Sequence, residues 1–238
     1  MRADLHIHTV LSPCGDIEMT PVNIVRKAVG MRLGIIGITD HNSTLHAKEA
    51  RKIGERNGLF VMCGAEITTK EEVHVLAFVD GDEAIEKLQL FLSDNIAKIP
   101  NDPDFFGYQL VVNENEEVLY EEENLLIGAI NKTIEETEEF VHSLGGIFIP
   151  AHIDKSQNSL LSQLGYMPPH LKADALELSS ICNFSDFMAK NSYLSKYNFI
   201  RSSDAHYLPD VGRVFTDFDI SEPSFESIRE AIRKSSIS

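Results

Sequence analysis

Basic residues are scarce in this chain of 238 residues. Lysine and arginine together number 21 against 37 aspartates and glutamates, which gives a formal net charge of −16. Non-specific binding of nucleic acid depends on Lys and Arg side chains that neutralise phosphates, so this balance argues against it. An enzyme that meets phosphate through bound metal ions is not excluded, because two or three divalent ions would offset part of the negative charge.

Cysteines and long apolar runs are scarce as well. The three cysteines, Cys14, Cys63 and Cys182, form no Cys-x-x-Cys pair, and such a set fits a reducing compartment better than a disulfide framework. No apolar run approaches the roughly 20 residues that a membrane-spanning helix needs. The N-terminus has no basic segment followed by a long apolar run, the pattern of a signal peptide. We therefore expect a cytoplasmic protein with no membrane partner.

Short apolar runs alternate with helical patterns along the chain. The runs are typical of strands buried on both faces of a parallel sheet, and they cover residues 3–8, 33–39, 59–65, 73–79, 147–151, 174–179 and 198–202. The helical patterns cover residues 20–32, 43–58, 130–146 and 222–235; the first should be capped by Thr20 with Pro21 at its first position, and the second should start after Ser43 or Thr44. This alternation predicts an α/β fold with a parallel sheet. The number of runs favours a closed or nearly closed barrel.

The segment from about 80 to 130 breaks this rhythm. Residues 80–96 have a helical pattern, and residues 100–124 contain an Asn/Glu-rich turn between two alternating runs, which indicates a hairpin. We interpret the segment as an insertion that covers one end of the barrel, within a single domain that spans residues 1–238.

Histidines and carboxylates gather in or beside the predicted strands. Most lie near the carboxyl ends of the runs, where the strands of a βα barrel converge on one face and build active sites. They are His6, His8, Asp40, His41, Glu66, His74, His152, Asp204 and His206. Burying so many polar groups without partners would be costly, and imidazoles with carboxylates are the usual ligands of Zn, Mn or Fe. The pattern therefore predicts a shared metal centre, whereas His46, His142 and His170 lack such company and are interpreted as ordinary polar residues.

Six motifs together resemble the PHP (polymerase and histidinol phosphatase) family of metal-dependent phosphoesterases. They are "DLHIHT" at 4–9, "GIIGITDHNS" at 34–43, "GAEI" at 64–67, "VHVLAF" at 73–78, "IPAHI" at 149–153 and "SSDAH" at 202–206. The resemblance implies a distorted (β/α)7 barrel, similar to a TIM barrel, and two or three divalent ions (Zn, Mn or Fe).

The resemblance also implies which residues hold these ions. The first ion would be bound by His6, His8, Glu66 and Asp204, and Glu66 would bridge it to a second ion bound by His74 and His152. The third would be bound by Asp16, His41 and His206; the loop "HTVLSPCGDIEMTP" is longer than the family's usual loop, and aligning back from Pro21 places Asp16 on the family's aspartate. Cys14 lies in the inserted part of that loop, either as a further ligand or as a small side chain only.

The favoured function is hydrolysis of a small phosphomonoester, a nucleotide or a metabolite phosphate, by a metal-activated hydroxide and without a protein nucleophile. Lys155, Arg201 and Arg213 are candidate phosphate-binding residues. A 3′–5′ exonuclease or phosphodiesterase acting on short oligonucleotides is the second alternative. A non-catalytic metal-binding domain and an amidohydrolase acting on C–N bonds are the others. The sequence does not specify the oligomeric state.

Overall fold

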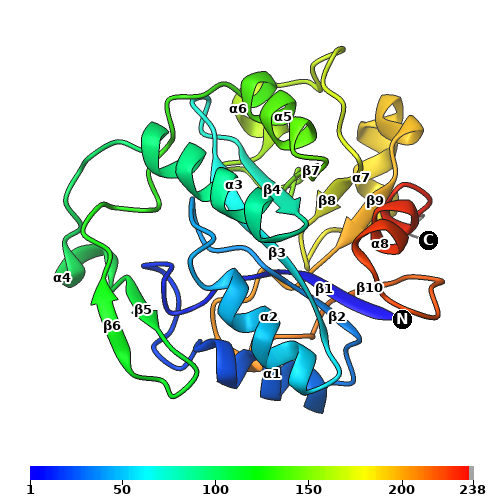
Figure 1. Cartoon of the computed structure of the whole chain (residues 1–238). Helices are drawn as coiled ribbons and strands as arrows, with labels where there is room; N and C mark the ends of the chain where they lie inside the picture. Colours follow the sequence, from blue (N-terminus) through cyan, green and yellow to red (C-terminus); the bar gives the residue numbers. More distant parts are fainter. Residues whose placement is uncertain (236–238) are drawn as a thin grey trace.

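The computed structural model describes residues 1–235, so the last three residues of the predicted 1–238 domain lie outside the described part. Each predicted apolar run contains a strand (Figure 1). The strands of these runs are β1 (Arg2–Ile7), β2 (Ile35–Ile38), β3 (Phe60–Thr68), β4 (His74–Val79), β7 (Ile147–Pro150), β8 (Leu176–Leu178) and β9 (Phe199–Arg201).

These strands curl into an incompletely closed barrel. One sheet has the order β10-β1-β2-β3-β4-β7, where β10 (Thr216–Asp217) is a short strand that the sequence did not predict, and β8 and β9 form a separate parallel pair. Backbone hydrogen bonds bridge the gaps. Between β7 and β8 the Ile153 N–H donates to the Glu177 carbonyl and the Asp174 N–H to the Phe148 carbonyl, both at 2.9 Å. Between β9 and β1 the Ala205 N–H donates to the His6 carbonyl at 3.1 Å and the His8 N–H to the Ala205 carbonyl at 3.0 Å. The barrel is therefore distorted, as expected.

The prediction of a parallel sheet is wrong for β4, and β10, which the sequence did not predict, is antiparallel as well. Strand β4 runs antiparallel to β3 and to β7, and β10 runs antiparallel to β1. Only residues 69–73 connect β3 to β4, whereas a parallel crossover needs a dozen residues or more. Because β4 is reversed, its first residue, His74, lies at the end of the barrel where β3 finishes.

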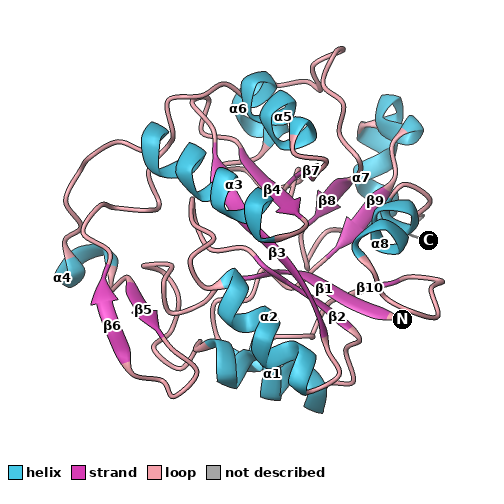
Figure 2. Cartoon of the chain, viewed as in Figure 1, coloured by secondary structure: helices cyan, strands magenta, loops and turns pink. Residues whose placement is uncertain are grey.

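The helices surround the barrel, except α4, which lies in the inserted segment away from it (Figure 2). They are α1 (Pro21–Gly30), α2 (Ala47–Arg56), α3 (Asp82–Asn95), α4 (Pro103–Phe106), α5 (Ile134–Ser143), α6 (Leu160–Leu164), α7 (Phe184–Lys190) and α8 (Phe225–Ile232), with short 3-10 turns η1 (Ser192–Lys196) and η2 (Leu208–Asp210). Helix α1 begins as predicted, because the Thr20 hydroxyl accepts a hydrogen bond from the Asn23 N–H and Pro21 is the first helical residue.

Helix α2 begins at Ala47, later than the predicted start after Ser43 or Thr44. The Thr44 hydroxyl does not cap it, because that hydroxyl and the Thr44 N–H both donate to the Oε1 atom of Gln89 in α3, at 3.0 and 2.6 Å. A tertiary contact thus replaces the local cap that the sequence favoured.

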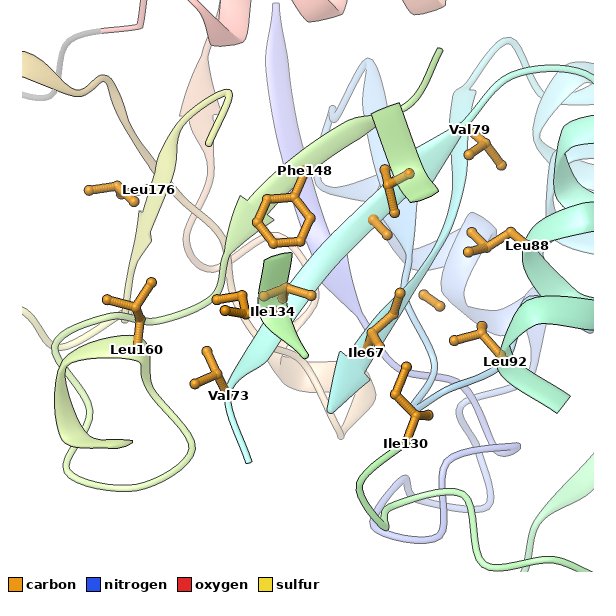
Figure 3. Close-up of a cluster of buried hydrophobic side chains, with 14 of the residues drawn as sticks. Ile67, Val73, Val79, Leu88, Leu92, Ile130, Ile134, Phe148, Leu160 and Leu176 are labelled. Atoms are coloured by element: carbon orange, nitrogen blue, oxygen red, sulfur yellow. The ribbon is translucent and has the colours of Figure 1, made fainter. Parts of the chain in front are cut away.

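The largest part of the core lies between the barrel strands and α3, α5 and α6. Figure 3 shows Leu88 and Leu92 of α3 facing Ile67 and Val79, while Phe148 fills the space beside β7. Leu88, Leu92, Ile67 and Phe148 are completely buried, and burying a large apolar side chain stabilises the fold by about 1.5–3 kcal/mol. This packing fixes β3 and β4, the strands that carry Glu66 and His74.

The predicted hairpin is present as β5 (Leu110–Val112) and β6 (Val118–Glu121), an antiparallel pair. It is attached to the barrel through His46, whose Nε2 accepts a hydrogen bond from the Val112 N–H at 2.9 Å. Farther along, the carbonyls of Leu126 and Gly128 accept hydrogen bonds from the Asn42 amide, both at 2.7 Å. The insertion therefore reaches the end of the barrel where β2 finishes. Among the described residues, no helix combines the length and the apolar character that crossing a membrane requires.

Candidate metal centre

Glu66 is the central residue of a buried cluster at one end of the barrel. It lies near the end of β3, is 1% exposed, and has imidazole nitrogens on all sides. The nitrogens within 3.3 Å of its carboxylate oxygens belong to His6, His8, His41, His74 and His152. One carboxylate thus faces five histidines from four different strands and their following loops.

Asp204 supplies a second carboxylate from the loop after β9. Its Oδ1 atom lies 3.4 Å from Nε2 of His6 and 3.5 Å from Nε2 of His8. Its backbone has a φ of +53°, and His152 has a φ of +30°. Such conformations are uncommon for residues with a side chain and concentrate at functional sites, where the surroundings hold the residue in place.

Hydrogen bonds on the outer side of the cluster fix which nitrogen of His6 and which nitrogen of His8 faces inward. The Nδ1 atom of His6 lies 3.0 Å from the Glu177 carboxylate, which can only accept. The Nδ1 atom of His8 lies 3.0 Å from the Ser12 hydroxyl, and that hydroxyl donates to Asp40 at 2.7 Å. Both Nδ1 atoms therefore carry the proton, which leaves the Nε2 lone pairs directed into the cluster. This is the arrangement that metal-binding histidines usually show.

Those two inward nitrogens lie only 3.2 Å apart. Two lone pairs at that distance repel each other unless a proton or a cation lies between them. The arrangement therefore fits a bound cation, with the Glu66 and Asp204 carboxylates supplying negative charge beside it.

The charged groups shift one another's pKa values in the direction that a cation site requires. Burial would raise the pKa of Glu66, but His74 and His6 outweigh it and hold the pKa well below its usual range. Burial would lower the pKa of His6, but the carboxylates of Glu177, Asp204 and Glu66 raise it well above its usual range. In the absence of metal, protons on the histidines compensate the carboxylate charge.

Several atoms in the cluster have no hydrogen-bond partner among the described residues. They include Nδ1 of His41 and Oδ1 of Asp204, both buried. Burial lowers the pKa of His41 well below its usual range, and burial together with His8 lowers the pKa of His206 to about 4. Neutral imidazoles with free lone pairs are the form that binds metals, so these orphaned atoms also fit bound ions.

The ligand atoms approach one another closely enough for metal binding in three overlapping groups. Within each group the atoms lie within 4.8 Å of one another, and the groups are His6–His8–Glu66, His41–Glu66–His74 and His8–His41–His206. Of the nine predicted ligands, six belong to these groups. His152 lies 3.0 Å from Glu66 and Asp204 lies 3.4 Å from His6, so only Asp16 stands apart.

The carboxylate of Asp16 points elsewhere. Its Oδ1 atom accepts a hydrogen bond from the Glu18 N–H at 2.9 Å, and the residues lining the cavity over the cluster, as far as the structure describes them, do not include it. Cys14 lines that cavity instead, together with Lys155.

The three candidate phosphate-binding residues lie in different surroundings. Lys155 reaches the cavity and forms an ion pair with the second oxygen of Asp204. Arg201 donates to the Cys182 carbonyl at 2.6 Å, and Arg213 forms an exposed ion pair with Asp210 at 2.7 Å. Only Lys155 of the three lines the cavity in the described part of the chain.

Sequence reasoning missed the residues that orient the histidines. Glu177 is 2% exposed in the middle of β8, and besides His6 it accepts a hydrogen bond from the His152 N–H at 3.1 Å. A glutamate inside the apolar run 174–179 was the available signal, because a buried charge needs a partner. Asp40 stands among the polar residues beside the predicted strands, but nothing in the sequence indicated its contact with Ser12, and Ser12 itself carried no signal because serine is common in loops.

Two family models match the chain. The PHP domain model matches residues 4–154, and a model described as PHP-associated matches residues 194–237. Over 78 residues, 32% of this chain, the sequence is 41% identical to the 5′-3′ exoribonuclease Rnm of Salmonella typhimurium, of which the match covers 26%. The matched segments make up 61% or less of the curated relatives, so the chain corresponds to part of each.

Solved structures share the fold over nearly the whole chain. The lesion-specific endonuclease EndoQ from Pyrococcus furiosus gives a TM-score of 0.74 at 21% identity, with coverage of 98% of this chain and 56% of the endonuclease. A Bifidobacterium adolescentis protein described as a metal-dependent phosphoesterase gives 0.68 at 20% identity, with coverage of 98% and 96%. At these identities the likeness concerns the fold alone.

Proposed function

Because this chain belongs to the PHP domain family, we propose that it is a metal-dependent phosphoesterase that hydrolyses a small phosphomonoester, a nucleotide or a metabolite phosphate. The observation that carries the proposal is the buried cluster in which one carboxylate, Glu66, contacts five histidines. Such a set of ligands binds two or three ions such as Zn, Mn or Fe.

The proposed ligands divide among the ions as the family resemblance implies, except that Asp16, which it assigns to the third ion, is left out because its carboxylate lies away from the cavity. His6, His8, Glu66 and Asp204 would hold one ion, Glu66, His74 and His152 a second, and His41 and His206 a third. Bound ions would supply Lewis-acid polarisation of the phosphoryl group and acidify a water molecule. The side chains of this chain provide the fixed geometry: Glu177 and Ser12 hold His6 and His8 in one tautomer, which spares reorganisation during the reaction.

Lys155 is the proposed phosphate-binding residue. Its ammonium group is paired with Asp204 at the cavity. Once Asp204 is occupied with a cation, the ammonium is free to donate to a phosphate oxygen, and a charged hydrogen bond of this kind contributes about 1.5–3 kcal/mol.

The size and charge of the cavity favour a small substrate. The cavity over the cluster has a volume of about 270 Å³, and its only lysine or arginine among the described residues is Lys155. Binding an oligonucleotide without sequence preference needs a groove with positive charge along several phosphates and aromatic side chains for stacking. A cavity with one lysine, in a chain of net charge −16, suits one phosphate group better.

A second candidate is an exonuclease or phosphodiesterase acting on short oligonucleotides. The 41% identity to the exoribonuclease Rnm over 78 residues favours it. The two candidates share the metal chemistry and differ in how much of the substrate lies outside the cavity.

Hydrolysis assays with matched substrates test the proposal. Purified protein, loaded with Mn or Zn and checked by elemental analysis, is given nucleoside monophosphates, sugar phosphates, bis(p-nitrophenyl) phosphate and 5′-phosphorylated oligonucleotides two to six residues long. We expect release of inorganic phosphate from monoesters with the highest kcat/KM. Faster cleavage of oligonucleotides supports the second candidate. Metal-loaded protein inactive on all of them, or active only on a dihydropyrimidine, would overturn phosphoesterase function.

A further inference from the structure

The loop between β1 and α1 presents a cysteine, rather than the expected aspartate, to the metal cavity. We propose that the Cys14 thiolate is a ligand of the third ion, together with His41 and His206. This inference rests on the metal centre of the proposed function and assigns a soft sulfur ligand to one of its positions.

The backbone of the loop is fixed on both sides of Cys14. The Gly15 N–H donates to the Ser12 carbonyl at 2.8 Å, which closes a tight turn around residues 13 and 14. A side chain at position 15 would place its Cβ only 2.4 Å from the Thr9 carbonyl oxygen, so the close approach of the turn requires glycine. The Ser12 hydroxyl is bound to Asp40 at 2.7 Å. Little conformational entropy remains to be lost when the thiol binds an ion.

The insertion covers the outer side of the same turn. A Cβ on Gly107 would lie 2.0 Å from the Pro13 carbonyl oxygen, so the two backbones are in direct contact. Because Gly107 covers the outer side at Pro13, the free side of the turn is the side of the cavity, which the Cys14 side chain lines.

The neighbouring aspartate is held away from the cavity by its own backbone contacts. The Asp16 N–H donates to the His206 carbonyl at 2.9 Å, and the Asp16 carboxylate accepts from the Glu18 N–H at 2.9 Å. The first bond ties the loop to the segment that carries His206. The loop therefore lies against a predicted ligand of the third ion, with the thiol in the cavity and the carboxylate outside it.

The other side of the proposed position has an unused ligand atom. His41 is 3% exposed and lines the same cavity. Its Nδ1 atom forms no hydrogen bond, although it lies 3.2 Å from Oε2 of Glu66. The Nδ1 atom of His206 faces the Asp204 carbonyl at 3.0 Å, which leaves its Nε2 lone pair for an ion. Because His8, which lies close to both, is assigned to the first ion, His41 and His206 alone would leave the third ion short of ligands: zinc and similar ions take four ligands, with one kept open for water in catalytic sites.

Sulfur changes which ion the position prefers. On coordination the thiol loses its proton to solvent and a sulfur electron pair forms the bond to the ion. Thiolate favours zinc and other ions with affinity for soft ligands over manganese or magnesium, which prefer oxygen. We therefore expect the third position to retain zinc or cobalt under conditions in which manganese is lost from it.

Cobalt(II) titration of the full chain tests the assignment, because a Co–thiolate bond gives an intense charge-transfer absorption in the near ultraviolet that imidazole and carboxylate ligands do not give. We expect this band in the wild-type protein, in Asp16→Asn and in the matched control Cys182→Ser. We expect its loss in Cys14→Ser, with fewer cobalt ions bound per chain. Cobalt-loaded wild-type protein without the band, or Cys14→Ser with the band unchanged, would overturn the proposal.

Alkylation of the wild-type protein is a second test, which applies even if Cys14→Ser does not fold. Zinc should protect Cys14 from iodoacetamide, read by mass spectrometry, and leave labelling of Cys182 unchanged; equal labelling of Cys14 with and without zinc contradicts the assignment. Neither readout depends on hydrolysis. A protein with the cobalt band and no phosphatase activity disproves the proposed function alone, and active protein without the band disproves the cysteine ligand alone.

Discussion

Histidines at the two ends of this barrel have opposite hydrogen-bonding environments. At the carboxyl ends of the parallel strands, five imidazoles crowd around the single carboxylate of Glu66. At the other end, before β7 and β8, His142 lies between two carboxylates of its own, with Nδ1 at 2.5 Å from Glu138 and Nε2 at 3.0 Å from Asp174. The Asp174 carboxylate also accepts hydrogen bonds from the Arg233 guanidinium and from the Phe148 N–H.

This difference separates a structural histidine from a functional one more reliably than burial does. His46 is as buried as the cluster, yet both its nitrogens are paired, with the Thr9 hydroxyl at 2.6 Å and the Val112 N–H at 2.9 Å. In the cluster around Glu66, by contrast, nitrogens face each other and buried atoms lack partners. Leaving buried polar atoms unpaired costs free energy, so a cation or protons bound between these side chains would stabilise the cluster.

Replacing a cluster histidine and replacing His142 should therefore have very different effects on turnover. We expect His8→Ala and Asp204→Ala to lower kcat/KM about a thousandfold or more, because bound ions supply several kcal/mol of charge stabilisation in the transition state. His142→Ala should keep wild-type kcat/KM. Steady-state assays on metal-verified, folded variants measure this; full turnover by His8→Ala would disprove the site assignment.

Bound metal should stabilise the folded protein only through the ligands around Glu66, and not through the opposite end of the barrel, where His142 lies. At a free zinc concentration 100 times the dissociation constant, one site adds about 2.7 kcal/mol to the free energy of unfolding. We expect that increase in the wild type and in His142→Ala, measured by urea unfolding with zinc and with EDTA, and its loss in Glu66→Gln. An equal effect of zinc on Glu66→Gln would place the stabilising ion elsewhere.

Most of the fold could be predicted because each strand is a short apolar run with clear boundaries. The direction of β4 was not predicted, although the five-residue connection after Thr68 excludes a crossover helix. The predicted run ended at Ala65, and the chain continues as strand through the polar residues Glu66 and Thr68 because they pair with Leu76 and His74. Pairing between strands, which no local pattern reports, decided the length of β3.

The candidate site could be predicted to a similar extent, and what the sequence could not supply again depends on contacts between distant segments. Strand ends and motif order indicated the residues that gather around Glu66. The loop with Cys14 and Asp16 depends on a local tight turn and on two contacts with segments distant in sequence, one with Gly107 and one with the His206 carbonyl. Spacing from Pro21 alone could not determine which of its two side chains faces the cavity.

A substitution at Lys155 tests whether the end of the barrel that carries Glu66 and its histidines also binds phosphate. Lys155→Met removes the ammonium group and keeps much of the apolar stem, and we expect kcat/KM for a phosphomonoester to fall about tenfold, because the side chain is 41% exposed and a charged hydrogen bond there is at the weak end of its range. Arg213→Met, which removes an exposed arginine paired with Asp210, is the matched control and should change nothing. A loss seen equally in both variants would indicate a general effect of net charge.

The smallest expected effect is a pH dependence of stability at the other end of the barrel. Hydrogen bonds to Asp174 and Glu138 raise the pKa of His142, so its protonated form favours the folded state. That contribution is fully present below the unfolded pKa of about 6.5 and is lost as the pH rises through the raised pKa of the folded state. His142→Asn should therefore lower the free energy of unfolding by about 1 kcal/mol at acidic pH and by less at alkaline pH. Urea unfolding in EDTA at both pH values measures the difference, with the exposed His170→Asn as control; an equal loss at both pH values would mean that His142 acts through packing alone.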